Sequence, residues 1–527
     1  SEMCIRDRSA FTDYADGSTP SGSSAYEKRG IAVDIPIWQP DNCIQCNRCA
    51  YVCPHAVIRP VALTEEEAAN APEGMQSIPM IGMPDMKFAI TVSAYDCTGC
   101  GSCANVCPGK KGEKALVMGN MEENAGKQTF FDYGREIPVK PEVVAKYKET
   151  TVKGSQFKQP LLEFSGACAG CGETPYAKLI TQLFGDRMYI ANATGCSSIW
   201  GNSSPSTPYT VNAKGQGPAW GNSLFEDNAE FGYGMLLAQR AIRDGLKAKV
   251  EDVVANGTNE DVKTAGQEWL DTFAVGATNG AATDKLVAAL EACGCDKAKE
   301  ILAQKDFLAK KSQWIFGGDG WAYDIGFGGV DHVLASGRDI NVMVFDTEVY
   351  SNTGGQSSKS TPTGAIAQFA AGGKETKKKD MASIAMSYGY VYVAQISMGA
   401  DFNQTVKAIA EAEAYPGPSL IIAYAPCINH GIKKGMAKAQ TEEELAVKVG
   451  YWHNFRFNPA AEGNKFSLDS KAPSMEDYQA FLDGEVRYNS LKRQNPEKAA
   501  RLFAKNEAEA KARFEYLQKL IALHSAE

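Results

Sequence analysis

Two short runs of cysteine carry the clearest chemical signal in this sequence. Each run has the spacing C-x2-C-x2-C-x3-C and is followed by proline, and the second run lies 54 residues after the first. Three closely spaced thiolates that bind one cubane, with a fourth that reaches to the other cubane, form the ligand pattern of paired 4Fe-4S clusters. The spacing therefore predicts two clusters, one held by Cys43, Cys46, Cys49 and Cys107 and the other by Cys97, Cys100, Cys103 and Cys53.

A pair of zinc sites is the alternative for these eight thiols, because thiolates also suit zinc. A zinc ribbon pairs two C-x2-C knuckles and has no need of a third cysteine and a proline in each run. Iron–sulfur clusters are therefore the preferred interpretation. Two coupled clusters by themselves indicate only one-electron transfer, and residues 61–86 between the runs are expected to form an insertion.

A second site is predicted where a glycine-rich turn follows an apolar run. Residues 314–334 (WIFGGDGWAYDIGFGGVDHVL) indicate a strand, a turn and a helix, and residues 340–356 (INVMVFDTEVYSNTGGQ) a second strand and a polar turn. A helix N-terminus reached through small residues favours phosphate, and Asp319 with oxygens from the second turn could hold a divalent ion. A dinucleotide site is the alternative, but the order G-x-G-x-x-G is absent. A helix cap is the ordinary structural role for Asp319.

These features together resemble pyruvate:ferredoxin oxidoreductases. GDG followed about 26 residues later by D-x-x-x-Y is similar to the thiamine diphosphate motif, with Thr347 where that motif usually has Asn. DTEVYSNTGGQ behind a two-cubane module resembles the family in which threonine occupies that place, and the resemblance covers nearly all of residues 26–527. It implies that Asp319, the Thr347 hydroxyl and the Val349 carbonyl bind Mg2+.

The same resemblance implies the residues that contact thiamine diphosphate. They are Glu173, Cys196, Gly318, Asp319, Gly320, Trp321, Thr347, Glu348, Val349, Tyr350, Ser351 and Asn352. Asn352 is implied to face pyruvate as a catalytic residue. The structural alternatives are an ordinary turn residue for Asn352 and a solvated loop carboxylate for Glu173.

Further cysteines lie outside the two runs. Cys168 and Cys171 have C-x-x-C spacing, which is also found in redox disulfides. The resemblance implies instead a third 4Fe-4S cluster near thiamine, held by Cys168, Cys171, Cys196 and Cys427. Free or buried thiols are expected for Cys4, Cys293 and Cys295, and surface imidazoles for His55 and His430, although either histidine could tune a neighbouring cluster.

The activity that the resemblance implies is oxidative decarboxylation of pyruvate to acetyl-CoA and CO2, with electrons passing singly through three clusters to ferredoxin or flavodoxin. The family also suggests a homodimer. An N-terminal half that supplies much of the pyruvate and CoA contacts is not visible, so this chain is interpreted as a C-terminal part that is inactive alone. Another 2-oxoacid:ferredoxin oxidoreductase and a simple electron carrier are the alternatives.

Composition limits the class of protein. With 527 residues, 44% hydrophobic and 22% charged, several globular domains are expected, and no apolar run is long enough to span a membrane. The net charge of -9 argues against binding to nucleic acid or to anionic membranes. Clustered cysteines in a chain of this size are typical of the reducing cytoplasm.

The elements that must position these residues alternate between apolar strands and helices over residues 161–440. This pattern predicts a parallel α/β sheet covered on both faces, here the thiamine diphosphate-binding domain. A small α+β domain of the bacterial two-cluster ferredoxin type is expected before it, over residues 26–140. Residues 1–25 are interpreted as a linker or a severed upstream segment, residues 141–160 as a linker and residues 441–527 as a C-terminal helical arm. The basic run 374–380 (KETKKKD) indicates a solvated loop, with ferredoxin docking as the alternative.

Overall fold

The structure is a computed structural model that describes residues 12, 14–203, 206–224 and 226–525. Residues 1–11, which include Cys4, and residue 13 of the predicted linker 1–25 lie outside the described residues. In the described remainder of that linker, Gly22 donates a backbone hydrogen bond to Tyr209 at 2.7 Å. This part of the linker is therefore packed on the larger domain.

An eight-stranded sheet forms the centre of the larger domain, in the order β13-β12-β10-β11-β9-β8-β6-β7. The pairings from β10 to β7 are all parallel, and β12 and β13 add antiparallel to the β10 edge. The strands are β6 (Met188–Ala193), β7 (Ala219–Ser223), β8 (Ser312–Gly318), β9 (Ile340–Asp346), β10 (Tyr392–Ile396), β11 (Pro418–Tyr424), β12 (Phe455–Phe457) and β13 (Phe466–Leu468).

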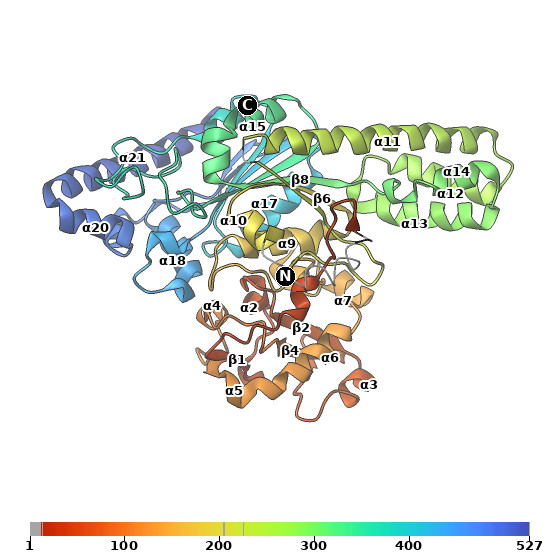
Figure 1. Ribbon diagram of the computed structural model, residues 1–527, viewed down its shortest axis with the longest axis horizontal. Coiled ribbons are helices and arrows are strands. Elements are labelled where there is room, and N and C mark those ends of the chain that lie inside the picture. The colour runs from red at the N-terminus through yellow and green to blue at the C-terminus, as the bar shows by residue number, and fades with distance from the viewer. Residues whose placement is uncertain (1–11, 13, 204–205, 225, 526–527) are drawn as a thin grey trace.

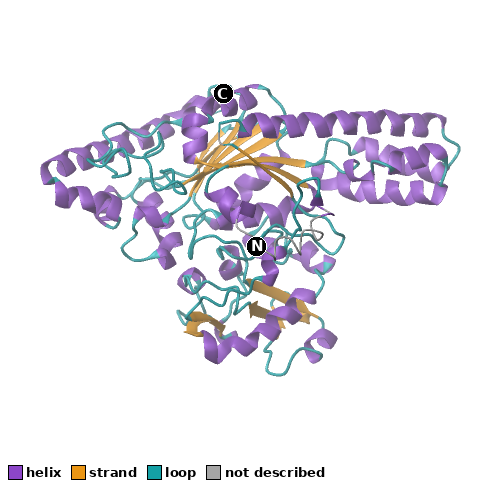
Figure 2. Cartoon of the chain, viewed as in Figure 1, coloured by secondary structure: helices purple, strands orange, loops and turns teal. Residues whose placement is uncertain are grey.

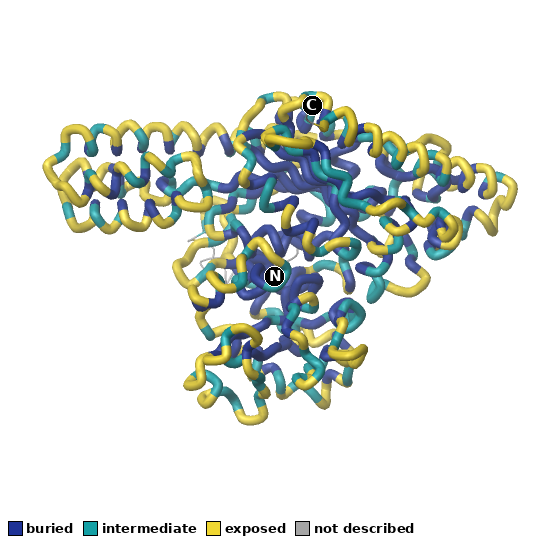
Figure 3. The backbone as a smooth tube through the Cα atoms, turned by 180° about the vertical axis from the view of Figure 1, so that it is seen from behind, coloured by how far each residue is buried: buried dark blue, intermediate teal, exposed yellow. Residues whose placement is uncertain are grey.

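Helices lie on both sides of this sheet (Figure 2), and its strands are buried (Figure 3). Along β9, Val342 and Val344 point to one apolar cluster while Met343 and Phe345 point to the other. A strand buried on both faces needs apolar residues at every position, which is why these strands read as continuous apolar runs. The predicted parallel α/β fold is confirmed.

Helices cover the two faces. One face packs against α9 (Thr174–Phe184) and α17 (Phe402–Ala414). The other face packs against the first turns of α11 (Asn228–Asn256) and against helices from the second half of the chain. These are α15 (Phe327–Ala335), α16 (Met381–Met386), α19 (Tyr478–Asp483), α20 (Val486–Gln494) and α21 (Pro496–Leu523).

The predicted helical arm over residues 441–527 is corrected in one respect. The segment contains β12 and β13, so it is partly strand and belongs to the main sheet. Its helices are also part of the main core, because Tyr478, Tyr488 and Leu502 are each buried in the same apolar cluster as the sheet. Burying these side chains removes them from water and ties the segment to the domain.

The smaller domain contains two short sheets and lies below the main sheet in Figure 1. The first sheet pairs β1 (Asp34–Trp38) with β5 (Leu116–Asn120), and the second has the order β2-β4-β3. The expected insertion over residues 61–86 is an ordered part of this second sheet. Its elements are β2 (Ile58–Leu63), α3 (Glu65–Ala69), β3 (Ile78–Met80) and β4 (Met83–Val92).

The predicted linker 141–160 is structured rather than free. It forms α7 (Pro141–Lys146) and α8 (Val152–Ser155), and Asn47 of the small domain donates a hydrogen bond to the Lys153 carbonyl at 3.0 Å. Lys178 on α9 also donates to the carbonyls of Ala50 and Tyr51. The two domains are therefore joined by direct polar contacts.

Four helices form an arm that extends to the right of the sheet in Figure 1. They are α11 (Asn228–Asn256), α12 (Glu260–Asp271), α13 (Gly276–Cys293) and α14 (Asp296–Leu302). The arm has its own apolar core around Leu246, Trp269 and Leu286. Throughout the described residues, no helix combines the length and apolar character that crossing a membrane requires.

Candidate functional site

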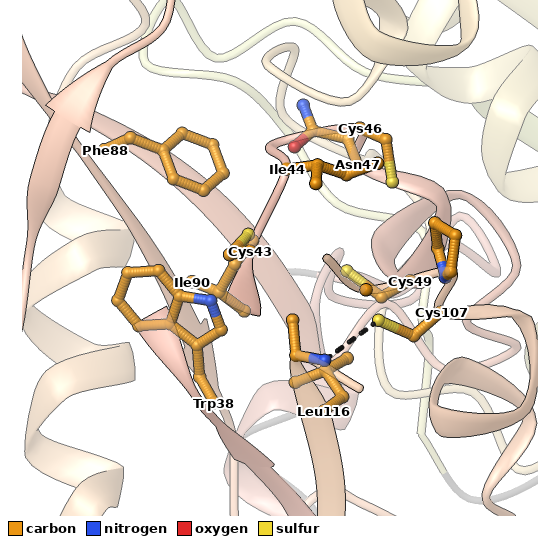
Figure 4. Close-up of a pocket in the computed structure, with 13 residues that line it drawn as sticks. Trp38, Cys43, Ile44, Cys46, Asn47, Cys49, Phe88, Ile90, Cys107 and Leu116 are labelled. Atoms are coloured by element: carbon orange, nitrogen blue, oxygen red, sulfur yellow. Dashed lines mark hydrogen bonds between the residues drawn. The ribbon is translucent and has the colours of Figure 1, made fainter. Parts of the chain in front are cut away.

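The first cavity in the small domain is lined by four thiols from both cysteine runs. They are Cys43, Cys46, Cys49 and Cys107. Trp38, Phe88 and Leu116 close its apolar side, as Figure 4 shows. The Cys107 sulfur accepts a hydrogen bond from the backbone N–H of Ala115 at 3.4 Å (Figure 4).

The second cavity contains the other four thiols of the two runs. They are Cys53, Cys97, Cys100 and Cys103. The fourth cysteine of each run therefore lies with the first three of the other run, as the spacing predicts.

Matching backbone turns present the thiols in both runs. Gln45 and Asn47 in the first run and Gly99 and Gly101 in the second all have positive φ, between 55° and 78°. The backbone N–H groups of Gln45 and Gly99 donate to the sulfurs of the cysteines two residues earlier, at 3.4 and 3.3 Å. Left-handed conformations wrap each chain segment around its cavity and turn N–H groups toward sulfur.

The buried thiols in each cavity lie so close together that a positive charge is needed to stabilise them as thiolates. Burial, followed by the charges of neighbouring cysteines, raises the pKa of Cys49 and of Cys103 well above the ordinary value. Iron would supply the charge that stabilises these groups as thiolates. In the described part of the chain, no three Cys, His, Asp or Glu side chains converge on one point as a single zinc ion requires. The spacing of the cysteines in each run is the observation that favours a cluster over zinc.

His55 lines the second cavity and is buried, so the expected surface imidazole is wrong. Its Nδ1 lies 3.2 Å from the Ser165 carbonyl, and its Nε2 has no hydrogen-bond partner among the described residues. Burial lowers the pKa of His55 to about 4, so the ring is neutral at pH 7. Nε2 is therefore available to contact a 4Fe-4S cluster bound in the second cavity.

The remaining predicted thiols gather at the carboxyl ends of the main-sheet strands. Cys171 and Cys427 are brought together because Gly172 donates a backbone hydrogen bond to Pro426 at 3.1 Å. A side chain at Gly172 would place its Cβ 2.6 Å from the Pro426 nitrogen, so glycine is required there. Burial, then Glu173, raises the pKa of Cys171 and of Cys196, and neighbouring thiols add to each shift. Cys168 is exposed at the rim of this group.

Glu173 is buried rather than a solvated loop carboxylate. Its Oε2 accepts a hydrogen bond from the Trp200 indole at 2.7 Å. Burial raises the pKa of Glu173 to about 7, and the Trp200 hydrogen bond opposes the rise. The carboxyl group is thus held in one orientation beside Cys171 and Cys196.

The three predicted Mg2+ ligands lie together at the ends of adjacent strands β8 and β9. The Thr347 hydroxyl lies 3.0 Å from both Asp319 Oδ1 and the Val349 carbonyl. Asp319 occupies the N-cap position of the following helical turn, but its side chain makes no capping hydrogen bond. Its second oxygen accepts from Ser358 at 2.5 Å. Three hard oxygens at one point suit Mg2+.

The turns on either side of these oxygens contain the other predicted cofactor residues. Gly320 begins a π-helical turn over residues 320–325, and a Cβ there would lie 2.4 Å from the Tyr350 ring. Gly318 ends β8, Trp321 is buried, and Asn352 is exposed in the turn after β9. The structure therefore groups these residues, while their contacts with a cofactor and the catalytic role of Asn352 stay predictions.

A buried ionic network lies behind the cofactor turn, and sequence reasoning missed it. Lys378 Nζ lies 2.8 Å from Asp346 and 2.9 Å from Glu348, and Arg487 lies 2.8 Å from the other oxygen of Glu348. Although burial opposes ionisation, Lys378 and Arg487 lower the pKa of Glu348 to about 2. The basic run 374–380 is therefore not simply a solvated loop, since Lys378 is inside this network.

His430 supports the same turn and is also buried, contrary to the expected surface position. Its Nε2 lies 2.7 Å from the Thr347 carbonyl. Burial, followed by the Arg487 charge, lowers the pKa of His430 to about 3, so a neutral ring donates this hydrogen bond. Ser358, Arg487 and His430 come from distant parts of the chain, and no local sequence pattern indicates their contacts.

Comparison with known families agrees with the two predicted domains. Residues 42–111 match the "4Fe-4S dicluster domain" family, and residues 273–423 match the "Thiamine pyrophosphate enzyme, C-terminal TPP binding domain" family. The chain thus contains a domain for two 4Fe-4S clusters and a thiamine diphosphate-binding domain. The first match contains both cysteine runs, and the second contains the Asp319 and Thr347 turns.

Curated relatives match almost the whole chain. Pyruvate-flavodoxin oxidoreductase from Enterobacter agglomerans is 57% identical over 523 residues, covering 97% of this chain and 44% of the relative. Pyruvate:ferredoxin oxidoreductase from Moorella thermoacetica is 57% identical over 525 residues, with the same coverage of 97% and 44%. Mitochondrial pyruvate dehydrogenase [NADP(+)] from Euglena gracilis is 49% identical over 516 residues, covering 96% of this chain and 28% of the relative. The chain spans less than half the length of these relatives.

Among solved structures, 2-oxoglutarate:ferredoxin oxidoreductase from Magnetococcus marinus aligns with a TM-score of 0.29 and 15% identity. The alignment covers 50% of this chain and 65% of that chain, a likeness too weak to inform the fold.

Proposed function

We propose, from the homology of this chain to the C-terminal portion of pyruvate-flavodoxin and pyruvate:ferredoxin oxidoreductases, that it is the electron-exporting part of such an enzyme. The complete reaction is the oxidative decarboxylation of pyruvate to acetyl-CoA and CO2. Ferredoxin or flavodoxin receives the electrons. The chain works in the cytoplasm as part of a homodimer, and it turns over little or no pyruvate by itself.

One observation carries this proposal: the turn with the Mg2+ oxygens directly contacts the third group of thiols. Ser351 Oγ lies 3.2 Å from the Cys196 sulfur, and the Ser351 carbonyl accepts from Asn429 at 3.2 Å. Asn429 also donates to the Cys427 sulfur at 3.6 Å. A cofactor held by Asp319 and Thr347 would therefore sit next to the thiols that hold a cluster.

The residues of this chain bind and orient the reacting groups. When bound, thiamine diphosphate supplies the carbanion chemistry, and Asp319, Thr347 and Val349 hold its Mg2+. Glu173 keeps a buried carboxyl group fixed by Trp200 at the same place. Asn352, exposed at the end of the turn, is free to meet the substrate carboxylate or keto group.

We infer that the three groups of thiols form an electron path away from this site, because neighbouring groups contact one another. Burial raises the pKa of Cys100 in the second cavity, and the backbone N–H of Gly170, within the Cys168–Cys171 loop, opposes the rise. His55, which lines the second cavity, is likewise in contact with the Cys168 backbone. Cys49 of the first cavity is close enough to raise the pKa of Cys103 in the second. Electrons would pass from the third group to the second cavity and then to the first.

Metal content tests the three-cluster arrangement. After anaerobic purification, three cubanes require about twelve iron atoms and about twelve acid-labile sulfides per chain. About eight of each would remove the third cluster from the proposal. Zinc in place of iron would overturn the whole electron path.

Reconstitution tests the reaction. The chain is co-expressed with the complementary N-terminal portion of the Moorella thermoacetica relative, and viologen reduction is followed with pyruvate or 2-oxoglutarate in the presence of CoA. We expect reduction that depends on pyruvate and CoA. Preference for 2-oxoglutarate would support another 2-oxoacid oxidoreductase. Full cluster loading without any stabilisation by thiamine diphosphate and Mg2+ would leave only an electron carrier.

A further inference from the structure

Two cysteines that take no part in the sites above lie at the far end of the arm formed by α11, α12, α13 and α14. Cys293 is the last residue of α13, and Cys295 immediately precedes α14. Ion pairs from Lys297 to Asp252 and from Lys249 to Glu300 place this turn beside the distal end of α11. The pair is therefore remote from the main sheet and from the other twelve described cysteines.

The two sulfurs face each other across a glycine. Cys293 Sγ lies 2.9 Å from Cys295 Sγ, with the Cys293 thiol as donor. Gly294 between them has φ 61°, the left-handed conformation that ends α13 and turns the chain back into α14. A Cβ at Gly294 would meet no atom within 4 Å, so the backbone conformation, and not lack of space, favours glycine here.

Both thiols are accessible to solvent, and their environments differ. Cys295 is exposed and Cys293 is half-buried against the arm core. The hydrogen bond from Cys293, followed by the backbone N–H of Ala298, lowers the pKa of Cys295 below the ordinary thiol value. The same contact raises the pKa of Cys293. One sulfur is thus favoured as the thiolate and the other as the thiol that donates to it.

We propose that Cys293 and Cys295 form a dithiol–disulfide couple, a redox modification site on the arm that is separate from the electron path. The geometry supports it because an accessible thiolate and a second thiol already in contact are the two groups that thiol–disulfide exchange requires. A single-ion metal site is the weaker interpretation, since no third Cys, His, Asp or Glu ligand joins the pair among the described residues.

The chemistry is a two-electron exchange with a small external disulfide such as glutathione disulfide. The Cys295 thiolate attacks one sulfur of that disulfide, forming a mixed disulfide and releasing one glutathione thiolate. Cys293 then loses its proton and attacks the Cys295 sulfur, which releases the second glutathione thiolate. The protein loses two electrons and two protons overall, and glutathione disulfide becomes two glutathione molecules.

Peptide mass spectrometry tests the couple directly. The full chain, purified anaerobically with its metal content recorded, is equilibrated in glutathione buffers of increasing oxidised fraction and then alkylated. Trypsin releases both cysteines in one peptide, residues 286–297 (LVAALEACGCDK). We expect this peptide to escape alkylation and to lose the mass of two hydrogens while iron content stays constant. Double alkylation at every buffer ratio would overturn the proposal.

Two single variants test the order of attack. In Cys293→Ser, Cys295 has no resolving thiol, so a stable mixed disulfide with glutathione should accumulate on the peptide. In Cys295→Ser, the remaining Cys293 should react several-fold more slowly. A mixed disulfide that persists in the unchanged chain, or faster reaction of Cys293 than of Cys295, would contradict the proposed mechanism.

Discussion

Arg487 Nη2 lies 2.8 Å from Glu348 Oε2, and this ion pair joins the C-terminal helices to the turn that carries the predicted Mg2+ ligands. Glu348 has φ 63°, a left-handed conformation that a residue with a side chain adopts only when its surroundings hold it. Tyr451 donates to the same carboxylate oxygen at 2.6 Å. The C-terminal segment therefore determines the shape of the cofactor turn.

Replacing Arg487 with methionine should destabilise the chain by about 3–5 kcal/mol, because Glu348 and Glu485 are then buried with less positive charge around them. The turn should also bind thiamine diphosphate and Mg2+ less tightly. Urea unfolding at pH 7 and thermal shift with the ligand measure the two effects. Arg501→Met is the matched control: its partner Glu375 is exposed, so no measurable change in stability is expected. Equal losses in the two variants would contradict the assigned role.

Asp319→Asn separates ligand binding from folding. Burial, then the charge of Asp346, raises the pKa of Asp319 well above its usual range, so loss of this carboxylate should not weaken the ligand-free fold. Stabilisation by thiamine diphosphate with Mg2+, about 2.7 kcal/mol at a hundredfold excess over Kd, should disappear. Asp324→Asn, on the same helical turn but paired with Lys359, should keep it. Full stabilisation of Asp319→Asn would exclude Asp319 as a ligand.

Cys427→Ser should remove one cluster without affecting the small domain. Iron should fall by about four atoms per chain, the content of one cubane. Cys295→Ser provides the comparison, because that thiol lies at the tip of the arm and its loss should leave iron unchanged. If Cys427→Ser retained all of its iron, the third cluster would need a different ligand set.

Lys178→Met should loosen the junction between the two domains. Lys178 is buried, and its Nζ donates to the Ala50 carbonyl and, at 3.0 Å, to the Tyr51 carbonyl. The Ala50 carbonyl keeps the Cys53 N–H as a donor, but the buried Tyr51 carbonyl loses the Lys178 donor, at a cost of about 1–3 kcal/mol. Hydrogen exchange should therefore rise in α2 (Arg48–Tyr51) and stay unchanged in α17. Lys214→Met removes an exposed ion pair with Asp284 and should leave hydrogen exchange unchanged in both helices. Unaltered exchange in α2 of the Lys178→Met variant would contradict a role for Lys178 at the domain junction.

The buried side chain of His453 should make the free energy of unfolding depend on pH. Burial, then the charge of Arg513, lowers its pKa to about 4. His453 is protonated below about pH 6.5 in the unfolded chain but only below about pH 4 in the folded chain. The free energy of unfolding therefore falls as the pH decreases from 6.5 to about 4. The slope from this group is at most about 1.4 kcal/mol per pH unit.

The variant His453→Phe keeps an aromatic ring beside Phe514 and removes the titration. Its stability should fall less steeply between pH 7.5 and 5.5, as measured by anaerobic urea unfolding, with iron content checked at each pH. Parallel curves for the two proteins would show that His453 does not carry the effect.

Much of the fold and of the candidate site is determined by local sequence. The first three cysteines of each run line the same cavity, because only two residues separate each from the next. The fourth cysteine, which precedes proline, lines the other cavity. Apolar runs such as 340–345 specify strands buried on both faces, and the GDG turn places Asp319 at the end of one of them. The parallel sheet and the two-cluster domain are confirmed, and the crossed grouping of cysteines is the arrangement in the structure.

The remaining contacts depend on tertiary structure, because they join segments whose sequence separation carries no periodic signal. The order of β8 and β9 brings Thr347 to Asp319, and the approach of Gly172 to Pro426 brings Cys427 to Cys171. Lys378 and His430 are typical of surface residues in the sequence, yet Lys378 is half-buried against two carboxylates and His430 is fully buried against the Thr347 carbonyl. A local pattern specifies which face of an element is apolar, but only the folded chain decides which distant polar group completes each buried pair.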